Sequence, residues 1–413
     1  MSPLKVVVYC TYPTLTTGYA RVANELLTRL DGDPALDLHV YGIQNDPRKA
    51  RELCYRTVSL YDAAANEGEN PSSGFGMFQF ADYLDRVKPD VLFIYNDPYV
   101  VSHVLQQVGD RNVRVVVYLD MFYANFYTHY TETIGSRADR ILVFSPCWQS
   151  HLSDLGLASG VLEHGFAADK FRPVDKAAAR DELGLPQDAF IVLNWNRNLV
   201  RKRLDIFLMA LVRLVVANPK AHILALLNSN KEVSFDVFDI LRHEFRAAGL
   251  RGDAVEAALG CCKVNYTALT DEQVNLVYNA ADIGVNTCEG EGFGLCNFEH
   301  AGVGRPQVVS RVGGLADIFD DTCAQMADPV SRYYLDLLTR DAIGGLAEVV
   351  DPQAVCHGMH VYLNDPALRA RHGGAAAARV RAKKYEWDTV ARRLKDELKE
   401  VLEPVASDID DLD

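Results

Sequence analysis

The 413-residue sequence has little positive charge relative to its negative charge. Its 42 lysine and arginine residues stand against 56 aspartate and glutamate residues, which leaves a formal net charge of -14 at pH 7. A general affinity for nucleic acid or for an anionic membrane requires a basic surface, so this composition argues against both kinds of partner. A bound phosphate group would therefore have to meet a local cluster of cations.

The sequence also lacks a long hydrophobic run and a paired-cysteine motif. No stretch of roughly 18 apolar residues occurs, and the N-terminal MSPLKVVVYC has the pattern of a β-strand rather than of a signal peptide. The nine cysteines are scattered without a CxxC spacing, which fits a reducing compartment better than a disulfide framework. We expect a soluble, cytoplasmic protein without a transmembrane segment.

The same scatter of cysteines offers no zinc site, and a single pair of histidines is a weak signal for another metal. The motif HGMH brings His357 and His360 close together in sequence, but no third ligand lies nearby. A solvated helix face explains this pair as well. The sequence therefore predicts no metal site and no cofactor.

Two successive patterns of short β-rich runs and amphipathic segments divide the chain, whose hydrophobic fraction is 49%. This length suits about two domains, and such alternation predicts parallel sheets with helical crossovers. We expect an α/β fold with two doubly wound Rossmann-like domains that face each other across a cleft, where ligands bind at the carboxyl ends of the strands. The β-rich runs are 5–10, 36–43, 90–95, 114–120 and 140–145 in the first half, and 190–195, 222–228, 283–287 and 306–310 in the second. The amphipathic segments are 19–30, 204–216 and 270–281.

The stretch NTCEGEGFGLCNFEHAGVGRP, residues 286–306, has two glutamates on either side of a glycine-rich loop. A short apolar strand precedes this loop, and Leu295 and Phe298 begin a helical spacing after it. Glu299 follows Phe298 near the packed face, where an ionised carboxylate needs a hydrogen-bond partner, and a ligand is one candidate. Glu291 suits the hydroxyl groups of a sugar, and the glycines let backbone amides approach a ligand. The alternative is a tight turn with a solvated glutamate.

A local basic cluster occurs in NWNRNLVRKRLD, residues 194–205, directly after a predicted strand. Its cations are Arg197, Arg201, Lys202 and Arg203. The planar guanidinium of arginine and the compact ammonium of lysine together suit a diphosphate. The alternative is a solvated run of charges. A second loop, TYPTLTTGYARVANEL at 11–26, brings the backbone of Gly18 toward the predicted cleft, unless it forms a plain N-cap turn.

These segments together resemble a known family. The motif EGFGLCNFE (291–299) matches the glutamate, seven residues, glutamate motif of retaining glycosyltransferases with the two-Rossmann-domain (GT-B) fold, specifically glycosyltransferase family 4. NRNLVRK resembles that family's arginine and lysine, HGFAADKFRP its domain-joining segment, and YEWDTVARRLKDEL (385–398) its last helix, which crosses back onto the N-terminal domain. The resemblance spans most of the chain and is densest from 160 to 320.

The resemblance implies domain boundaries. Residues 1–165 form an N-terminal, acceptor-side Rossmann-like domain, which the crossing helix 386–403 joins. Residues 166–385 form the domain that binds the nucleotide sugar, and they begin with a polar connector and a short helix at 166–187. Residues 404–413 form an acidic tail.

The resemblance also implies a role for each site residue. Glu291 contacts the sugar of the donor, Glu299 contacts the nucleotide ribose, and Arg197 with Lys202 holds the diphosphate. The amides of Gly18 and of Gly292, Phe293, Gly294 and Leu295 line the phosphate and the sugar. Glu291, Arg197 and Lys202 are thus the catalytic candidates, without a metal.

The implied reaction is transfer of a sugar from a UDP- or GDP-sugar to a hydroxyl group, with retention of anomeric configuration. The acceptor is a glycan, a lipid-linked or a protein-linked group, and nucleic acid is not a partner. Many relatives carry His-Asp after the strand that RVVVYLD resembles, whereas this chain has Leu119 and Asp120. A histidine contact is therefore missing or supplied elsewhere, and Asp120 remains a substrate-binding candidate. A nucleotide-sugar epimerase, a phosphorylase and a non-catalytic sugar-nucleotide-binding protein are the alternatives.

Overall fold

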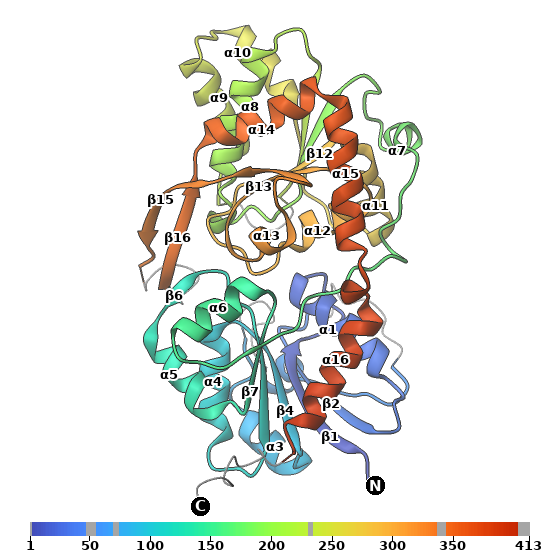
Figure 1. Ribbon diagram of the computed structural model, residues 1–413, viewed down its shortest axis with the longest axis vertical. Coiled ribbons are helices and arrows are strands. Elements are labelled where there is room, and N and C mark those ends of the chain that lie inside the picture. The colour runs from blue at the N-terminus through green and yellow to red at the C-terminus, as the bar shows by residue number, and fades with distance from the viewer. Residues whose placement is uncertain (1, 47–54, 69–73, 230–233, 337–343, 404–413) are drawn as a thin grey trace, which may run out of the picture.

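The computed structural model describes residues 2–46, 55–68, 74–229, 234–336 and 344–403. Within these ranges two parallel sheets lie in separate halves of the molecule, and helices pack on both faces of each sheet (Figure 1). This arrangement confirms the predicted α/β class with two Rossmann-like domains. The predicted acidic tail 404–413 lies outside the described residues.

The sheet of the N-terminal half is parallel throughout, as the alternating pattern predicts. From edge to edge its strands are β3 (Ser59–Asp62), β2 (Leu36–Ile43), β1 (Leu4–Thr11), β4 (Val91–Asn96), β5 (Arg114–Leu119), β7 (Arg140–Val143) and β8 (Gly160–Val161). The helices of this half are α1 (Gly18–Leu30), α2 (Ala63–Glu67), α3 (Phe80–Val87), α4 (Pro98–Val108), α5 (Thr128–Arg137) and α6 (Pro146–Asp154). Successive residues of β1 point to opposite faces, so Val6 and Val8 pack in the cluster that contains α1, while Val7 and Tyr9 pack in the cluster that contains α4.

The sheet of the C-terminal half repeats this architecture. Its parallel strands are β11 (Cys262–Asn265), β10 (Ile223–Asn228), β9 (Phe190–Asn194), β12 (Ile283–Asn286), β13 (Gln307–Ser310) and β14 (Ala324–Ala327). Its helices are α8 (Leu204–Ala217), α9 (Val237–Ala247), α10 (Asp253–Ala258), α11 (Asp271–Ala280), α12 (Leu295–Gly302), α13 (Gly313–Ile318), α14 (Pro352–Asn364) and α15 (Pro366–Val380). The expected strands and helices of both halves are therefore confirmed, although their ends differ by a few residues.

The final helix, α16 (Trp387–Glu400), packs on α1 of the N-terminal half, so the predicted crossing is confirmed (Figure 1). One face of α16 is apolar and buried, and its polar face makes ion pairs with N-terminal residues. Asp388 lies 2.8 Å from Arg29, and Glu397 lies 2.6 Å from Arg140. These contacts link the two halves at a point distant in sequence from the connector.

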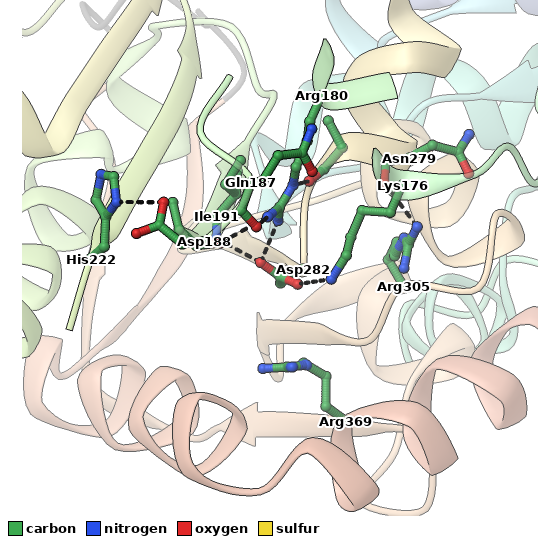
Figure 2. A network of polar contacts seen from close by, with 12 residues as sticks. Lys176, Arg180, Gln187, Asp188, Ile191, His222, Asn279, Asp282, Arg305 and Arg369 are labelled. Atoms are coloured by element: carbon green, nitrogen blue, oxygen red, sulfur yellow. Dashed lines mark hydrogen bonds and ion pairs between the residues drawn. The ribbon is translucent and has the colours of Figure 1, made fainter. Parts of the chain in front are cut away.

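The predicted connector contains its short helix, α7 (Lys176–Glu182), and this helix is bound tightly to the C-terminal sheet. Arg180 of α7 is 1% exposed, and its guanidinium lies 2.8 Å from the carboxylate of Asp282, which also accepts from the backbone amide of Ile191 at 2.8 Å. Figure 2 shows Lys176 approaching the same carboxylate, at 2.9 Å. A buried charge with this many partners is satisfied, so we interpret the network as structural.

A third sheet joins the halves and was not predicted. It is antiparallel, in the order β15 (Pro329–Tyr334), β16 (Gly344–Val350) and β6 (Ala124–Phe126), and β6 belongs to the N-terminal half. No helix in the described ranges combines the length and the apolar character that a membrane span requires.

Candidate active site

A cavity of about 460 Å³ lies between the two halves, where the carboxyl ends of strands from both parallel sheets meet. This is the position at which open α/β sheets bind their ligands. Most of the predicted site residues line it: Gly18, Asp120, Arg197, Lys202, Glu291, Phe293, Gly294 and Leu295. Gly292 and Glu299 lie behind the cavity wall rather than on it.

Glu291 and Lys202 form a buried ion pair on this wall. Their side chains are 8% and 11% exposed, and the ammonium of Lys202 contacts one carboxylate oxygen of Glu291 directly. The guanidinium of Arg201 lies 3.5 Å from the other oxygen. Burial alone would raise the pKa of Glu291, but Lys202 and Arg201 outweigh it and lower that pKa to about 2. Glu291 is therefore an ionised, buried carboxylate, which excludes the alternative of a solvated glutamate.

The glycines around Glu291 permit close contact between the two halves. A side chain at Gly290 would meet the backbone oxygen of Phe122 at 2.2 Å, and one at Gly292 would meet a carboxylate oxygen of Asp120 at 2.3 Å. Gly294 has a φ of 90°, a conformation that glycine adopts without strain. Groups of the N-terminal half thus lie against Gly290 and Gly292, whereas the sequence predicts that a ligand approaches these glycines.

Glu299 of α12 finds its hydrogen-bond partners within the protein. The hydroxyl of Tyr278 donates to it at 2.8 Å, and the guanidinium of Arg21, from α1 of the other half, lies 3.0 Å away. Burial raises the pKa of Glu299, and Arg21 opposes that rise. The predicted need for a partner is confirmed. Since Tyr278 and Arg21 both line the cavity, Glu299 lies one side chain away from it.

The four cations of the predicted basic cluster have different environments. Arg197 is exposed and lines the cavity, and its guanidinium makes no ion pair with any residue in the described ranges. Arg201 stacks on the ring of Phe122 at 4.3 Å. Arg203 turns to Asp205, at 2.9 Å, and does not line the cavity. A uniformly solvated run of charges is therefore excluded.

Asp120 and Gly18 complete the N-terminal wall. The side chain of Asp120 forms a hydrogen bond with Tyr19, and burial raises the pKa of this carboxyl group while Tyr19 opposes the rise. Gly18 begins α1, and Thr17 caps the helix by accepting from the backbone amide of Ala20 at 3.2 Å. The N-cap alternative is thus correct for this loop, and Gly18 nonetheless lines the cavity.

Several cavity residues were missed by sequence reasoning. Arg21 lies inside the amphipathic segment 19–30, and His164 begins the domain-joining segment HGFAADKFRP; neither segment predicts a ligand contact. His164 is 2% exposed and lines the same cavity as Asp120. Leu119, at the position where the family resemblance implies a histidine, is buried in β5 and does not line the cavity.

Comparison with known proteins confirms the resemblance. Residues 193–331 match the family model described as "Glycosyl transferases group 1". The chain is 30% identical over 271 residues to a D-inositol 3-phosphate glycosyltransferase from Streptosporangium roseum, an alignment that covers 64% of this chain and 56% of the relative. A protein of the same name from Streptomyces avermitilis is 31% identical over 237 residues, which cover 57% of this chain and 45% of the relative. The chain thus spans about half the length of the curated relatives it matches.

Solved structures confirm the GT-B fold. Sucrose-phosphate synthase from Thermosynechococcus elongatus superimposes with a TM-score of 0.73 at 17% identity, over 96% of this chain and 99% of that one. The HepE protein of Anabaena, solved in complex with UDP-glucose, gives a TM-score of 0.69 at 14% identity, over 96% and 100% of the two chains. At such identities the likeness concerns the fold.

Proposed function

We propose that this chain is a glycosyltransferase that moves a sugar from a nucleoside diphosphate sugar to an acceptor hydroxyl group with retention of anomeric configuration. The observation that carries the proposal is that the buried Lys202–Glu291 pair and the exposed Arg197 line the same cavity. The cavity thus combines cations for a diphosphate with an ionised carboxylate for sugar hydroxyls.

The diphosphate would be held by Arg197 and Lys202. Arg197 has a guanidinium without a partner among the described residues, and Lys202 already faces the cavity while it contacts Glu291. As the bond between sugar and phosphate breaks, negative charge grows on the leaving diphosphate, and cations held in place lower the energy of that state. Catalysis therefore depends mainly on electrostatic stabilisation of the leaving group.

The transferred sugar would lie against Glu291. With a pKa of about 2 this carboxylate is ionised at neutral pH, so it accepts hydrogen bonds from hydroxyl groups. Its tight pairing with Lys202 makes it a poor nucleophile, and we propose that the leaving phosphate itself assists the incoming acceptor on the same face of the sugar. The amides of Gly18, Gly294 and Leu295 would contact the phosphate and the sugar.

UDP is the nucleotide that we propose for the donor. The Anabaena HepE structure contains UDP-glucose, and another structure with this fold, a trehalose-phosphate synthase from Burkholderia xenovorans at 13% identity, is described as UDP-forming. We infer the same donor class for this chain, with Glu299 and its partner Tyr278 at the ribose.

Incubation with a panel of UDP- and GDP-sugars, followed by detection of the released nucleoside diphosphate, tests the proposal. The wild type is expected to release nucleoside diphosphate from at least one donor, and Arg197→Ala should release much less. Arg242→Ala is the matched control, because Arg242 lies outside the cavity and pairs with Glu256 at 3.1 Å. Conversion of one nucleotide sugar to another without release would indicate an epimerase. Binding without any turnover would indicate a non-catalytic protein.

A further inference from the structure

The two ring nitrogens of His164 have different environments. Nδ1 lies 2.8 Å from the hydroxyl of Tyr118, and that hydroxyl donates to the backbone oxygen of Leu162 at 2.8 Å. A phenol hydroxyl has a single hydrogen, so toward His164 it acts as an acceptor. Nδ1 therefore carries the ring proton, and Nε2 carries a lone pair.

His164 lines the cavity although the residue is only 2% exposed. Within the described ranges the Nε2 atom of His164 has no hydrogen-bond partner. It is also absent from the set of fully buried polar atoms without a partner, so we infer that it is accessible from the cavity. Burial lowers the pKa of His164 to about 3, so the ring is neutral at neutral pH. Nε2 is thus an open hydrogen-bond acceptor in the wall.

Aromatic rings pack against His164 near the loop that carries Glu291. Its ring centroid lies 4.1 Å from that of Phe144 and 4.9 Å from that of Phe293. Phe293 belongs to the loop that carries Glu291, whereas the cavity-lining residues Asn228 and Asn265 stand at the carboxyl ends of β10 and of the edge strand β11.

An open acceptor in this position restricts the ligand that can lie there. A hydroxyl group donates to Nε2, whereas a phosphate or carboxylate oxygen has no hydrogen to offer at neutral pH and would face a lone pair. Asp120 and Glu291, on the same cavity, are also acceptors when ionised. This set of groups suits a ligand rich in hydroxyls.

We propose that Nε2 of His164 accepts a hydrogen bond from one hydroxyl group of the transferred sugar and thereby selects donors that carry a hydroxyl at that position. This inference rests on the proposed function, since it assigns a partner within the donor. It makes His164 a substrate-binding residue that the sequence did not indicate.

The test is a comparison of nucleotide sugars that each lack one hydroxyl. Donor hydrolysis is measured for the wild type and for His164→Phe, which keeps an aromatic ring in the same packing and removes both nitrogens. In the wild type one deoxy donor should lose roughly tenfold in kcat/KM, as expected for one hydrogen bond. In His164→Phe the kcat/KM for the parent donor should fall by the same factor, and replacing the parent donor with the deoxy donor should cause no further loss. The affinity of this variant for free nucleoside diphosphate should stay within about twofold of wild type.

His372→Phe is the matched control. His372 is also buried and also pairs through Nδ1 with a tyrosine hydroxyl, that of Tyr362 at 2.8 Å, but it lies outside the cavity. This variant should penalise the deoxy donor as the wild type does. If His164→Phe also loses kcat/KM with the deoxy donor relative to the parent donor, His164 only packs in the wall and the inference is wrong.

A second measurement needs no variant. Nitrogen NMR of the wild type should show His164 protonated at Nδ1, with an Nε2 signal that moves on addition of the nucleotide sugar and not of the nucleoside diphosphate. A proton on Nε2, or an Nε2 signal that ignores the sugar, would overturn the inference. A wild type that binds and hydrolyses no nucleotide sugar would instead contradict the proposed function.

Discussion

Replacement of Glu291 by glutamine removes a negative charge from the cavity wall without changing the size of the side chain. In the wild type this charge faces the ammonium of Lys202, whose side chain is 11% exposed. Glutamine leaves that ammonium buried with a neutral partner. The variant should therefore be less stable, although the same substitution leaves the proposed phosphate ligands in place.

The size of the effect follows from burial. Loss of one partner of a buried ion pair costs about 3–5 kcal/mol, because the remaining charge stays desolvated. Lys202 faces a cavity that admits water, and Asp120 is also close enough to interact electrostatically with it, so we expect a value near the lower end, about 3 kcal/mol. Turnover should fall as well, since the lost carboxylate would contact the transferred sugar, whereas nucleoside diphosphate affinity should be nearly unchanged.

The assay is denaturant unfolding at pH 7 with and without saturating nucleoside diphosphate. Ligand should stabilise Glu291→Gln at least as much as it stabilises the wild type, because the diphosphate supplies a new partner for Lys202. The double variant Lys202→Met, Glu291→Gln is the control, and it should recover part of the lost stability since no unpaired ammonium remains. An unfolding free energy of Glu291→Gln within about 0.5 kcal/mol of wild type, the range of an ordinary surface substitution, would refute the reasoning.

Four further outcomes are expected. Arg197→Ala should weaken nucleoside diphosphate binding by about 1.5–3 kcal/mol in calorimetry, while Arg242→Ala should not; equal affinities would remove Arg197 from the site. Glu299→Gln should weaken the donor and the free nucleoside diphosphate by a similar amount, and wild-type affinity for both would contradict a contact with the ribose. Turnover should persist in excess chelator, since no group of three or more metal-ligating side chains occurs in the described part of the chain; a loss that manganese or magnesium restores would contradict this. Burial lowers the pKa of His164, and that of the buried His300 in α12, to about 3. As the pH falls through about 6.5, these histidines take up protons in the unfolded chain but not in the native state. Each should therefore reduce the free energy of unfolding by about 1.4 kcal/mol between pH 7.5 and pH 5.5. If the stability of His164→Phe falls as steeply with decreasing pH as that of the wild type, His164 does not contribute to the loss.

The predicted parts of the fold are those that local pattern determines. Each run of β-rich residues became a strand because it is buried on both faces, and each crossover helix has one apolar side. The antiparallel sheet that joins the halves has no comparable signal. Its strand β6 has three residues, and it pairs with β16, which lies more than 200 residues further along the chain. Such a pairing depends on how the two halves meet.

The candidate site also combines features that the local sequence predicts with features that depend on tertiary contacts. The glutamate motif and the basic cluster lie in short segments that follow predicted strands, so their position at one cavity could be predicted. The environments of Arg201 and Arg203 could not, because adjacent cations look alike in sequence and only the tertiary contacts distinguish them. The contact of Arg21 with Glu299 joins a helix of one half to a helix of the other, and a single sequence carries no sign of it.

Proton NMR of the sugar released from a nucleotide α-sugar, recorded before mutarotation, tests the central claim most directly. We expect the α-anomer to appear first, in step with the release of nucleoside diphosphate, and both signals should be much weaker with Arg197→Ala. Early appearance of the β-anomer would contradict retention, and the absence of any released sugar or transfer product across the donor panel would contradict the proposed glycosyltransferase activity.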